Sequence, residues 1–577
     1  MHIFKYCKIY TRVAIAATAL VCITLPAWTS PNAASKFDWE ATNGWIVSAK
    51  DSLSVVADGD TYAWNTAVKP ADTWSLSADI NITDMKNGIG ASRLVFGDST
   101  RKPLIIISVE HHITGISLIT VKLRDQLFLN TVGGGRPGGD SSYHATISRN
   151  GNSIRVKVYG NKGLEFVEDT PKIDEALLNS IAVFGVGSSG GSIEFSNITF
   201  QSPVEKPGHY RVLADSAMDD LLRNYWTGGP DEGYIIPTYG GYHGAASSPM
   251  PKGSMWERSQ MLFAMDTYYQ ATGDPLAKRR IAAEWSDIKK TFTKEELVAA
   301  GSIVHPACDD CGWDSMVYLV IYKDLGDPYA LEVAKGLIDN AFKRWLNDDF
   351  GGGMRYDNRK MKSLCQAAEI LCALQIWKAT GDKTFHDRAM NCYNWVESHL
   401  LRPDGIYWCD YGWTSDGPEL ADRPNDIFEG GSVSFFGGNM GMAVVHAYLY
   451  RITGDEKYLR RAIRTAEGIF QKETRDGIYL NDRDAWSNGT FAGYWVRDVL
   501  SLPGIDAKHK DILLKTADAI YKNARTPYGY YGGCWNGPAD GPDSPWSVRG
   551  FKPQQITTST STANMIMGAA LAEKVQR

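Results

Sequence analysis

Two adjacent carboxylates, Asp309 and Asp310, are the residues of this sequence best suited to catalysis. They come just before an apolar stripe with helical spacing, formed by Trp313, Met316, Val317, Val320 and Ile321. We therefore expect both carboxylates in the turn that enters a helix, where they can face the same side. Inside a helix, adjacent side chains diverge by about 100°. A helix N-terminus also favours an ionised carboxylate.

Paired carboxyl groups are what glycoside hydrolases place on either side of the bond they cut. A retaining enzyme holds them roughly 5–5.5 Å apart, and an inverting enzyme needs a wider gap for water. Adjacent α-carbons are about 3.8 Å apart, so the shorter separation is the easier one to reach. On the motif alone a plainer interpretation stays open, in which Asp309 caps the helix and Asp310 is solvated.

The chain divides near residue 203 into two halves with different hydrophobic periods. From 36 to 203 apolar residues alternate, as in the segment 73–82, and the run 149–152 is a hairpin signal. We predict an all-β jelly-roll sandwich here, whose run from 143 to 200 resembles laminin-G and legume-lectin-type domains. Such a domain could bind carbohydrate or serve as a structural spacer, because the fold does not decide the function.

From 207 to 577 the period becomes helical. We predict twelve helices, over 210–226, 255–272, 276–292, 313–325, 328–347, 363–380, 383–401, 436–453, 456–473, 491–502, 508–525 and 560–575. Four joints, at 273–274, 326–327, 381–382 and 454–455, share a Gly-Asp pair in which glycine ends one helix and aspartate caps the next. Repeated helical hairpins indicate an all-α (α/α)6 toroid, whose longer connections would gather on one rim and form a cleft.

The helical half resembles glycoside hydrolase family 76, the endo-α-1,6-mannanases, over nearly all of 210–577. That family has an Asp-Asp pair followed closely by tryptophan, as Asp309, Asp310 and Trp313 are here. Further pieces resemble its pattern in the same order. They are the glycine loop that ends at Tyr356, the pair Lys362-Ser363, the run Gly438-Asn439-Met440-Gly441, and Phe491-Ala492-Gly493 with Arg497.

This resemblance implies a retaining double displacement at an α-1,6-mannosidic bond, with Asp309 as nucleophile and Asp310 as general acid/base. The negative charge of Asp309 should then raise the pKa of Asp310. Substrate contacts are expected from Trp256, Trp313, Tyr356, Lys362, Asn439, Phe491 and Arg497. No metal or cofactor is implied.

Departures from the family pattern affect the substrate more than the reaction. Asp314, Ser363, Met440 and Ala492 stand where the family usually has Trp, Asn, Gln and Lys. Polar contacts control discrimination between substrates strongly. An α-1,6-glucan or a decorated mannan therefore stays open as the substrate, and so does transglycosylation instead of hydrolysis.

Two further classes are weighed against this interpretation. Unsaturated-uronide hydrolases and polysaccharide lyases use similar helical rings but favour basic residues around an acidic substrate, and the helical half has no obvious Arg/Lys cluster on its loops. The other is a non-catalytic surface protein with a sugar-binding sandwich. The intact set of Asp309, Asp310 and Trp313 argues against it.

Composition and the first residues indicate an exported protein with a neutral partner. The formal net charge is −6 and there is no long basic run, which disfavours nucleic acid and anionic membranes as partners. Residues 1–35 are typical of a signal peptide, with Lys5, Lys8 and Arg12 before the apolar run 13–25. An uncleaved anchor is the alternative. We expect a secreted or cell-surface monomer that binds a polysaccharide.

The cysteines do not predict a disulfide framework or a metal centre. Seven of the nine follow the predicted signal peptide, all at position 308 or later, and this is an odd number. Cys308 and Cys311 have zinc-like spacing but lack a second ligand pair at a sensible distance. Whether these two form a local disulfide is left open.

Overall fold

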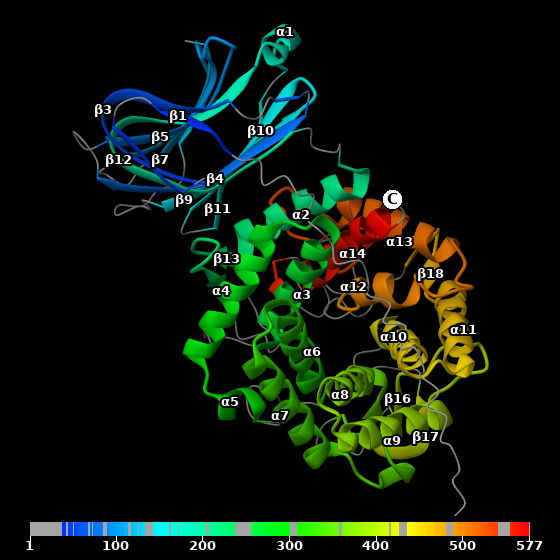
Figure 1. Cartoon of the computed structure of the whole chain (residues 1–577). Helices are drawn as coiled ribbons and strands as arrows, with labels where there is room; N and C mark the ends of the chain where they lie inside the picture. The colour runs from blue at the N-terminus through cyan, green and yellow to red at the C-terminus, as the bar shows by residue number, and fades with distance from the viewer. Residues whose placement is uncertain are drawn as a thin grey trace, which may run out of the picture.

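The computed structural model consists of a β domain followed by a ring of helices (Figure 1). It describes residues 37–575 except 42–43, 50, 67–69, 72, 85–88, 113–116, 125, 133–141, 161–162, 171, 203–206, 237–254, 300–307, 357–360, 415–416, 426–435, 480–487 and 540–553. The predicted signal peptide lies outside the described residues. The two halves have separate hydrophobic cores.

The β domain is one curled antiparallel sheet of twelve strands among the described residues. They are β1 (Trp39–Ala41), β2 (Trp45–Ala49), β3 (Ser52–Asn65), β4 (Trp74–Asp84), β5 (Ile89–Gly97), β6 (Pro103–His112), β7 (Ser117–Leu123), β8 (Gln126–Val132), β9 (Ser142–Asn150), β10 (Ser153–Gly160), β11 (Gly163–Asp169) and β12 (Val183–Gln201). The long strand β12 lies between β4 and β5 in the strand order and also pairs with β3, so it connects the two halves of the sheet. In β4 every second residue from Trp74 to Ile82 is buried, because neighbouring side chains point to opposite faces of a strand.

The helical half has twelve long helical segments in its described part, as predicted. They are α2 (His209–Tyr225), α3 (Met255–Thr272), α4 (Pro275–Thr291), α6 (Cys308–Leu325), α7 (Pro328–Trp345), α8 (Ala367–Thr380), α9 (Lys383–His399), α10 (Phe436–Thr453), α11 (Glu456–Lys472), α12 (Ala492–Tyr494) continued by the π-helical turn η3 (Trp495–Val499), α13 (Lys508–Ala519) continued by η4 (Ile520–Ala524), and α14 (Ile556–Val575). The predicted fold, an all-β domain followed by an (α/α)6 toroid, is confirmed.

Six of these helices form a closed inner ring. Each packs on the next in the order α3, α6, α8, α10, α12 with η3, and α14, and α14 packs back on α3. The inner helices are buried on nearly every side, and in α14 every residue from Ile556 to Ala572 is buried. The outer helices α4, α7, α9, α11, α13 and α2 cover this ring (Figure 1).

The Gly-Asp joints connect inner helices to outer helices as the sequence predicts. The four glycines, Gly273, Gly326, Gly381 and Gly454, have φ between 70° and 76°, a backbone region that favours glycine. Each following aspartate accepts a hydrogen bond from the backbone N–H two residues later; for Asp274 the acceptor-to-donor distance is 2.9 Å. These tight joints lie at the C-terminal ends of α3, α6, α8 and α10. The inner-helix N-termini therefore share the opposite rim of the ring.

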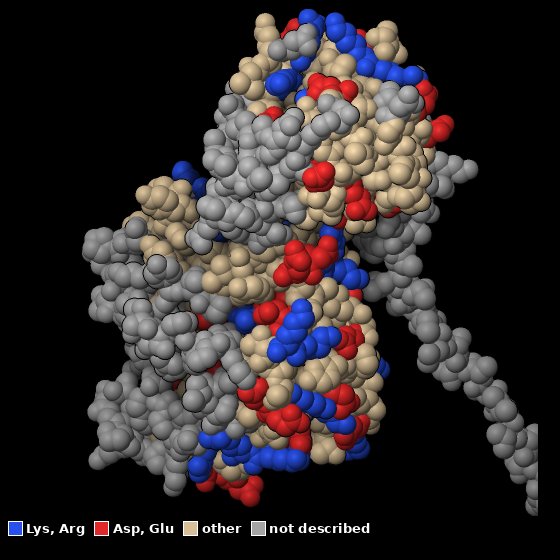
Figure 2. All heavy atoms as spheres, turned by 90° about the vertical axis from the view of Figure 1, so that its left-hand side faces the viewer, with Lys and Arg blue, Asp and Glu red and all other residues tan. Residues whose placement is uncertain are grey.

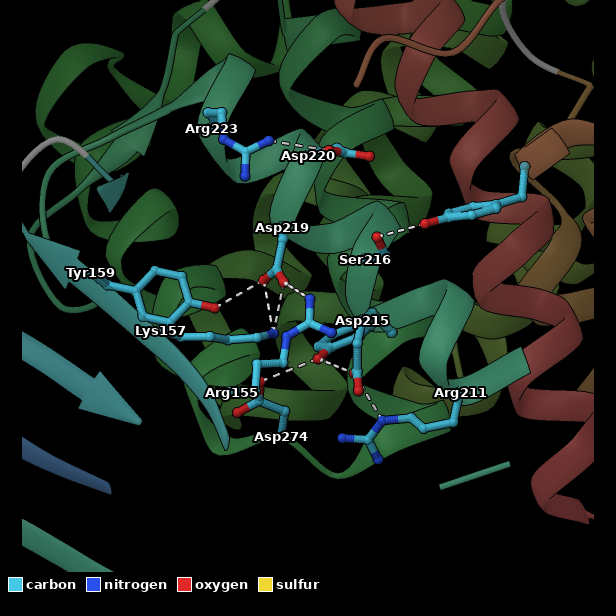
Figure 3. Close-up of polar contacts among 12 residues, drawn as sticks. Arg155, Lys157, Tyr159, Arg211, Asp215, Ser216, Asp219, Asp220, Arg223 and Asp274 are labelled. Atoms are coloured by element: carbon cyan, nitrogen blue, oxygen red, sulfur yellow. Dashed lines mark hydrogen bonds and ion pairs between the residues drawn. The ribbon is translucent and has the colours of Figure 1, made fainter. Parts of the chain in front are cut away.

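The two domains meet through a polar contact that we call the interdomain seam. One part of it is formed by Arg155, Lys157, Tyr159 and Asp219 (Figure 3), and the other by Asp79 and Arg279. Asp219 of α2 is 4% exposed, and the Nζ atom of Lys157 on β10 lies 2.8 Å from its Oδ2 atom. The hydroxyl of Tyr159 donates to the other carboxylate oxygen at 3.1 Å. At a second point, Arg279 of α4 lies 2.9 Å from Asp79 of β4.

Lys157 is charged within this seam despite its burial. Burial alone would lower the pKa of Lys157, but the carboxylate of Asp219 raises it above the ordinary value. The guanidinium of Arg280 also lies over the Tyr159 ring, 4.5 Å from its centroid. A buried and paired charge of this kind fixes geometry, because removing either partner leaves the other uncompensated.

The outer surface carries mixed charge. On the face drawn in Figure 2, Lys and Arg lie beside Asp and Glu over the described helical half. The helices of the described residues include none that is long and apolar enough to cross a membrane.

Candidate active site

The aspartate pair lies on the rim where the inner helices begin. Asp309 and Asp310 are in the first turn of α6, and both side chains are partly buried. Trp256 is the second residue of α3, and Phe491 directly precedes α12. The ring therefore brings residues from three separate segments of the chain to one place.

The helix that carries the pair begins earlier than expected. We predicted a helix from residue 313 with both carboxylates in the turn before it, but α6 begins at Cys308. The backbone N–H of Cys308 donates to the carbonyl of Tyr356 at 2.7 Å, which ties this helix end to the neighbouring loop. The Oδ1 atom of Asp309 accepts from the backbone N–H of Asp310 at 3.1 Å.

Asp309 is an unusual carboxyl group. Burial raises its pKa to about 6, although the side chains of Cys365 and Trp313 and the backbone N–H groups of Asp310 and Asp309 itself act to lower it. The Cys365 thiol and the Trp313 indole reach it from two elements, η2 (Leu364–Gln366) and α6. Near neutral pH such a group is mostly ionised although it is only partly exposed to water.

Three aromatic side chains pack side by side next to the aspartate pair. The Trp256 and Trp313 rings have centroids 6.1 Å apart, and Trp313 meets Phe491 edge to face at 5.3 Å. Trp256 is half-buried, whereas Trp313 is 2% exposed and Phe491 fully buried. Of the three, Trp256 is therefore the one with a surface open to a ligand.

Three other predicted substrate contacts are held inside the protein. Lys362 is fully buried, and its Nζ atom donates to the carbonyls of Asn347, Gly352 and Gly353. Tyr356 is 9% exposed and lies next to the aspartate pair through its bond with Cys308. Asn439 is fully buried; its Oδ1 atom accepts from the Tyr407 N–H at 2.9 Å. Their substrate contacts stay predictions, and these bonds hold the rim loops.

The structure contradicts the placement of Arg497. Its guanidinium donates to Gln270 at 2.7 Å and lies 3.6 Å from a carboxylate oxygen of Asp266. Gln270 is near the C-terminal end of α3, about 21 Å along the helix from Trp256 at 1.5 Å per residue. Arg497 therefore lies on the opposite rim and is not part of this site.

Sequence reasoning missed buried carboxyl groups close to the pair. Glu369 in the first turn of α8 is fully buried, and Asp309 and Asp310 both raise its pKa further, beyond the effect of burial. Asp314 is 1% exposed and accepts a 2.5 Å hydrogen bond from Ser259 of α3, with its pKa raised by burial to about 7. For Glu369 the available signal was a single charged residue inside an apolar helical run, whereas Asp314 was noted only as a departure from the family pattern.

The described cysteines do not form disulfides. Cys308, Cys311, Cys365, Cys372, Cys392, Cys409 and Cys534 are free, and all but Cys534 are buried. Burial holds the thiol pKa of Cys308 well above its ordinary value, so it behaves as a small apolar group. The described residues contain no group of three or more His, Cys, Asp or Glu side chains placed to hold a metal ion.

An inner ring with a carboxylate pair at its rim defines a toroidal glycoside hydrolase. The model of glycosyl hydrolase family 76 matches residues 211–571, and the chain belongs to this family. The predicted resemblance of the helical half is thereby confirmed. A comparison with curated proteins finds no match.

Several solved structures share the fold. One is an inactive variant of an α-1,6-mannanase of Salegentibacter sp. HEL1_6 in complex with α-1,6-mannotriose, 18% identical over 63% of this chain and 99% of that chain, with a TM-score of 0.50. A family 76 mannosidase from Bacteroides thetaiotaomicron VPI-5482 is 17% identical over 64% and 100% of the two chains, also at 0.50. A family 76 hydrolase from a bovine Bacteroides thetaiotaomicron strain covers 89% of this chain and 97% of its own, at 15% identity and 0.50.

Proposed function

We propose that this protein is a secreted retaining glycoside hydrolase that cleaves α-1,6-mannosidic bonds in mannan, with Asp309 as nucleophile and Asp310 as general acid/base. The observation that carries this proposal is the environment of Asp309. It is partly buried in the first turn of α6, its pKa is raised by burial and lowered by the side chains of Cys365 and Trp313, and it is adjacent to a second carboxyl group. A nucleophile needs to be ionised and poorly solvated, and this position provides both.

The two steps follow from these roles. In the first, an Asp309 oxygen bonds to the anomeric carbon while Asp310 gives its proton to the departing glycosidic oxygen. In the second, Asp310 takes a proton from water, the water oxygen bonds to the anomeric carbon, and the ester to Asp309 breaks. The N-terminus of α6 stabilises the carboxylate that is regenerated.

The substrate class is supported by relatives rather than by a bound ligand. The Salegentibacter structure pairs α-1,6-mannotriose with a variant in which two consecutive aspartates are replaced, and that variant is described as inactive. Asp309 and Asp310 are the consecutive pair of this chain within the matched region. Trp256 is only partly buried and could offer part of its ring to the apolar face of a pyranose.

The β domain and the location of the protein complete the proposal. We assign the curled sheet to the laminin-G-like class and propose that it contacts the same polysaccharide. The signal-like segment 1–35 supports export, and the mixed surface charge fits a neutral glycan better than nucleic acid or a membrane (Figure 2). We propose that the protein acts as a monomer.

Product analysis tests the catalytic proposal. The full chain is incubated with debranched α-1,6-mannan, intact yeast mannan, an α-1,6-glucan and a polyuronate, beside Asp309→Asn and Asp310→Asn. A matched control is Asp348→Asn, because Asp348 and Asp349 form a second adjacent pair and Asp348 is exposed. We expect oligosaccharides from the mannan with the wild type and the control only.

The outcomes separate the parts of the proposal. Activity near the wild-type value in either pair variant would refute the assigned roles. Products from the glucan alone would keep the mechanism and change the substrate, and lengthened glycans would indicate transglycosylation. No products from any of the four glycans would favour a carbohydrate-binding protein.

A further inference from the structure

Glu369 lies directly behind the aspartate pair and has no role in the mechanism above. It is in the first turn of α8, and every residue from Ala367 to Leu374 is buried. Neither carboxyl oxygen has a well-formed hydrogen-bond partner among the described residues. An ionised carboxylate in such a place would be very costly, so the neutral acid is the favoured form.

The packing against α6 places this carboxyl group near Asp309. A methyl group on Gly312 would lie 2.9 Å from the carboxyl carbon of Glu369 and 2.8 Å from the Cβ atom of Ala368. Gly312 thus leaves the space that the Glu369 side chain fills. Residues three apart share one face of a helix, so Asp309 lies one turn above this contact on α6.

The groups around Glu369 are acids and thiols. From α6 it faces Asp309, Asp310, Cys308 and Cys311. The thiols of Cys365 on η2, Cys392 on α9 and Cys372 on its own helix also interact with it. Two other packed helices direct their charges elsewhere. On α7, Asp339 pairs with Lys343 and Arg388, and on α10 His446 lies with Tyr407.

We propose that Glu369 is a positioning residue for Asp309: it stays protonated behind the aspartate pair, and it excludes water from Asp309 while leaving Asp309 to carry the buried negative charge. This inference rests on the proposed function. Burial and the neighbouring carboxylates both hold the pKa of Glu369 well above its ordinary value, in the direction the proposal requires.

The bound proton is tested without any substrate. A group that is protonated in the folded state and ionised in the unfolded state makes the unfolding equilibrium constant rise about tenfold per pH unit. This applies above the ordinary glutamate pKa and up to the raised one. We measure the unfolding equilibrium constant in urea between pH 6 and 8. For the wild type it should rise about tenfold more per pH unit than it does for Glu369→Gln. Glu332→Gln, at an exposed site on α7, is the control and should run parallel to the wild type.

The positioning role is tested by the acidic side of the pH profile of kcat/KM on the mannan. Glu369→Ala opens a space for water beside Asp309. The pKa of Asp309 should therefore fall, and the acidic limb should move to lower pH by about one unit. We also expect about a tenfold loss of kcat/KM. Glu369→Gln has the same shape and no charge, so it should restore both values to within about threefold of the wild type. If the alanine variant does not fold, Glu369→Val, which also leaves the place of the carboxyl group empty, is compared with Glu369→Gln instead.

Two results would overturn this inference. One is parallel unfolding of the wild type and Glu369→Gln, which would mean that Glu369 binds no extra proton. The other is a downward shift of the acidic limb in Glu369→Gln, which would mean that Glu369 is charged in the working enzyme. Asp309→Asn distinguishes the two proposals: if it keeps activity the proposed function fails, whereas an inactive Asp309→Asn with either result above rejects the role of Glu369 alone.

Discussion

The indole of Trp313 lowers the pKa of Asp309, which stands four residues before it on the same helix. Residues at this spacing face each other on a helix surface. The tryptophan that follows the aspartate pair in the sequence is therefore placed to donate to the proposed nucleophile. Its ring is buried between Trp256 and Phe491, which fixes the direction of that donor.

Replacing Trp313 by Phe should lower kcat/KM by roughly ten- to a hundredfold, because a hydrogen bond to a charged group contributes about 1.5–3 kcal/mol. The phenyl ring keeps an aromatic contact with Phe491 but cannot donate. In the wild type the Trp313 side chain lowers the pKa of Asp309. Without it that pKa should rise, and the acidic limb should move to higher pH. Trp285→Phe is the control, since Trp285 donates to Asp327 at 2.7 Å on an outer helix. Equal losses in both variants would contradict this role.

The pH profile of the wild type should have an acidic limb near pH 6. The pKa of Asp309 is raised to about 6 by burial, and the proposed nucleophile must be ionised. Activity is therefore retained above this pH and lost as the pH falls through it, about tenfold per unit well below the pKa. Steady-state rates on the mannan measure this, with circular dichroism to show that the protein is still folded. A flat profile down to pH 4 would contradict it.

Gly312→Ala should destabilise the protein by about 1–3 kcal/mol, as overpacking of a well-packed core does. The added methyl group would meet Ala368 at 2.8 Å and the carboxyl carbon of Glu369 at 2.9 Å, so α6 and α8 must move apart. Thermal unfolding measures the loss, and activity should fall with it because Asp309 is on α6. Gly59→Ala is the control, because a methyl group at Gly59 meets nothing within 4 Å. An unchanged melting temperature would show that the two helices can separate freely.

Asp219→Asn should destabilise the chain by about 3–5 kcal/mol, because Lys157 would remain buried without its counter-charge. The double variant Lys157→Met with Asp219→Leu removes both charges and should recover much of that loss. Calorimetry on the full chain compares the two. Asp518→Asn is a control at an exposed pair with His209, and it should have little effect. A double variant as unstable as the single one would show that the loss comes from packing.

Local sequence signals predicted the elements well. The Gly-Asp joints define helix ends through two local effects, the left-handed glycine and the aspartate cap, and neither depends on distant residues. The aspartate pair and Trp313 are likewise close in sequence. Their grouping follows once α6 is recognised as a helix.

The rest of the site depends on which helices are neighbours, and this is not written in local patterns. Glu369 lies behind the aspartate pair because α8 packs against α6 at Gly312. Arg497 was misplaced because it follows Phe491 by only six residues, yet those residues carry the chain from one rim of the ring toward the other. The interdomain seam could not be predicted for the same reason. Lys157 fits the alternating pattern of its strand, and only the packing of the two domains places Asp219 next to it.

The interdomain seam changes what a second sugar-binding surface could contribute. On a flexible tether, the effective concentration of one binding surface at another falls as the linker lengthens, roughly as its −3/2 power. Here the pair of Asp219 and Lys157 fixes the β domain against α2 (Figure 3), and Arg279 fixes it against α4. A glycan held by the β domain would reach the rim at one set distance and direction. Chains that span this distance would gain avidity and shorter ones would gain none, so the seam would act as a ruler for polymer length.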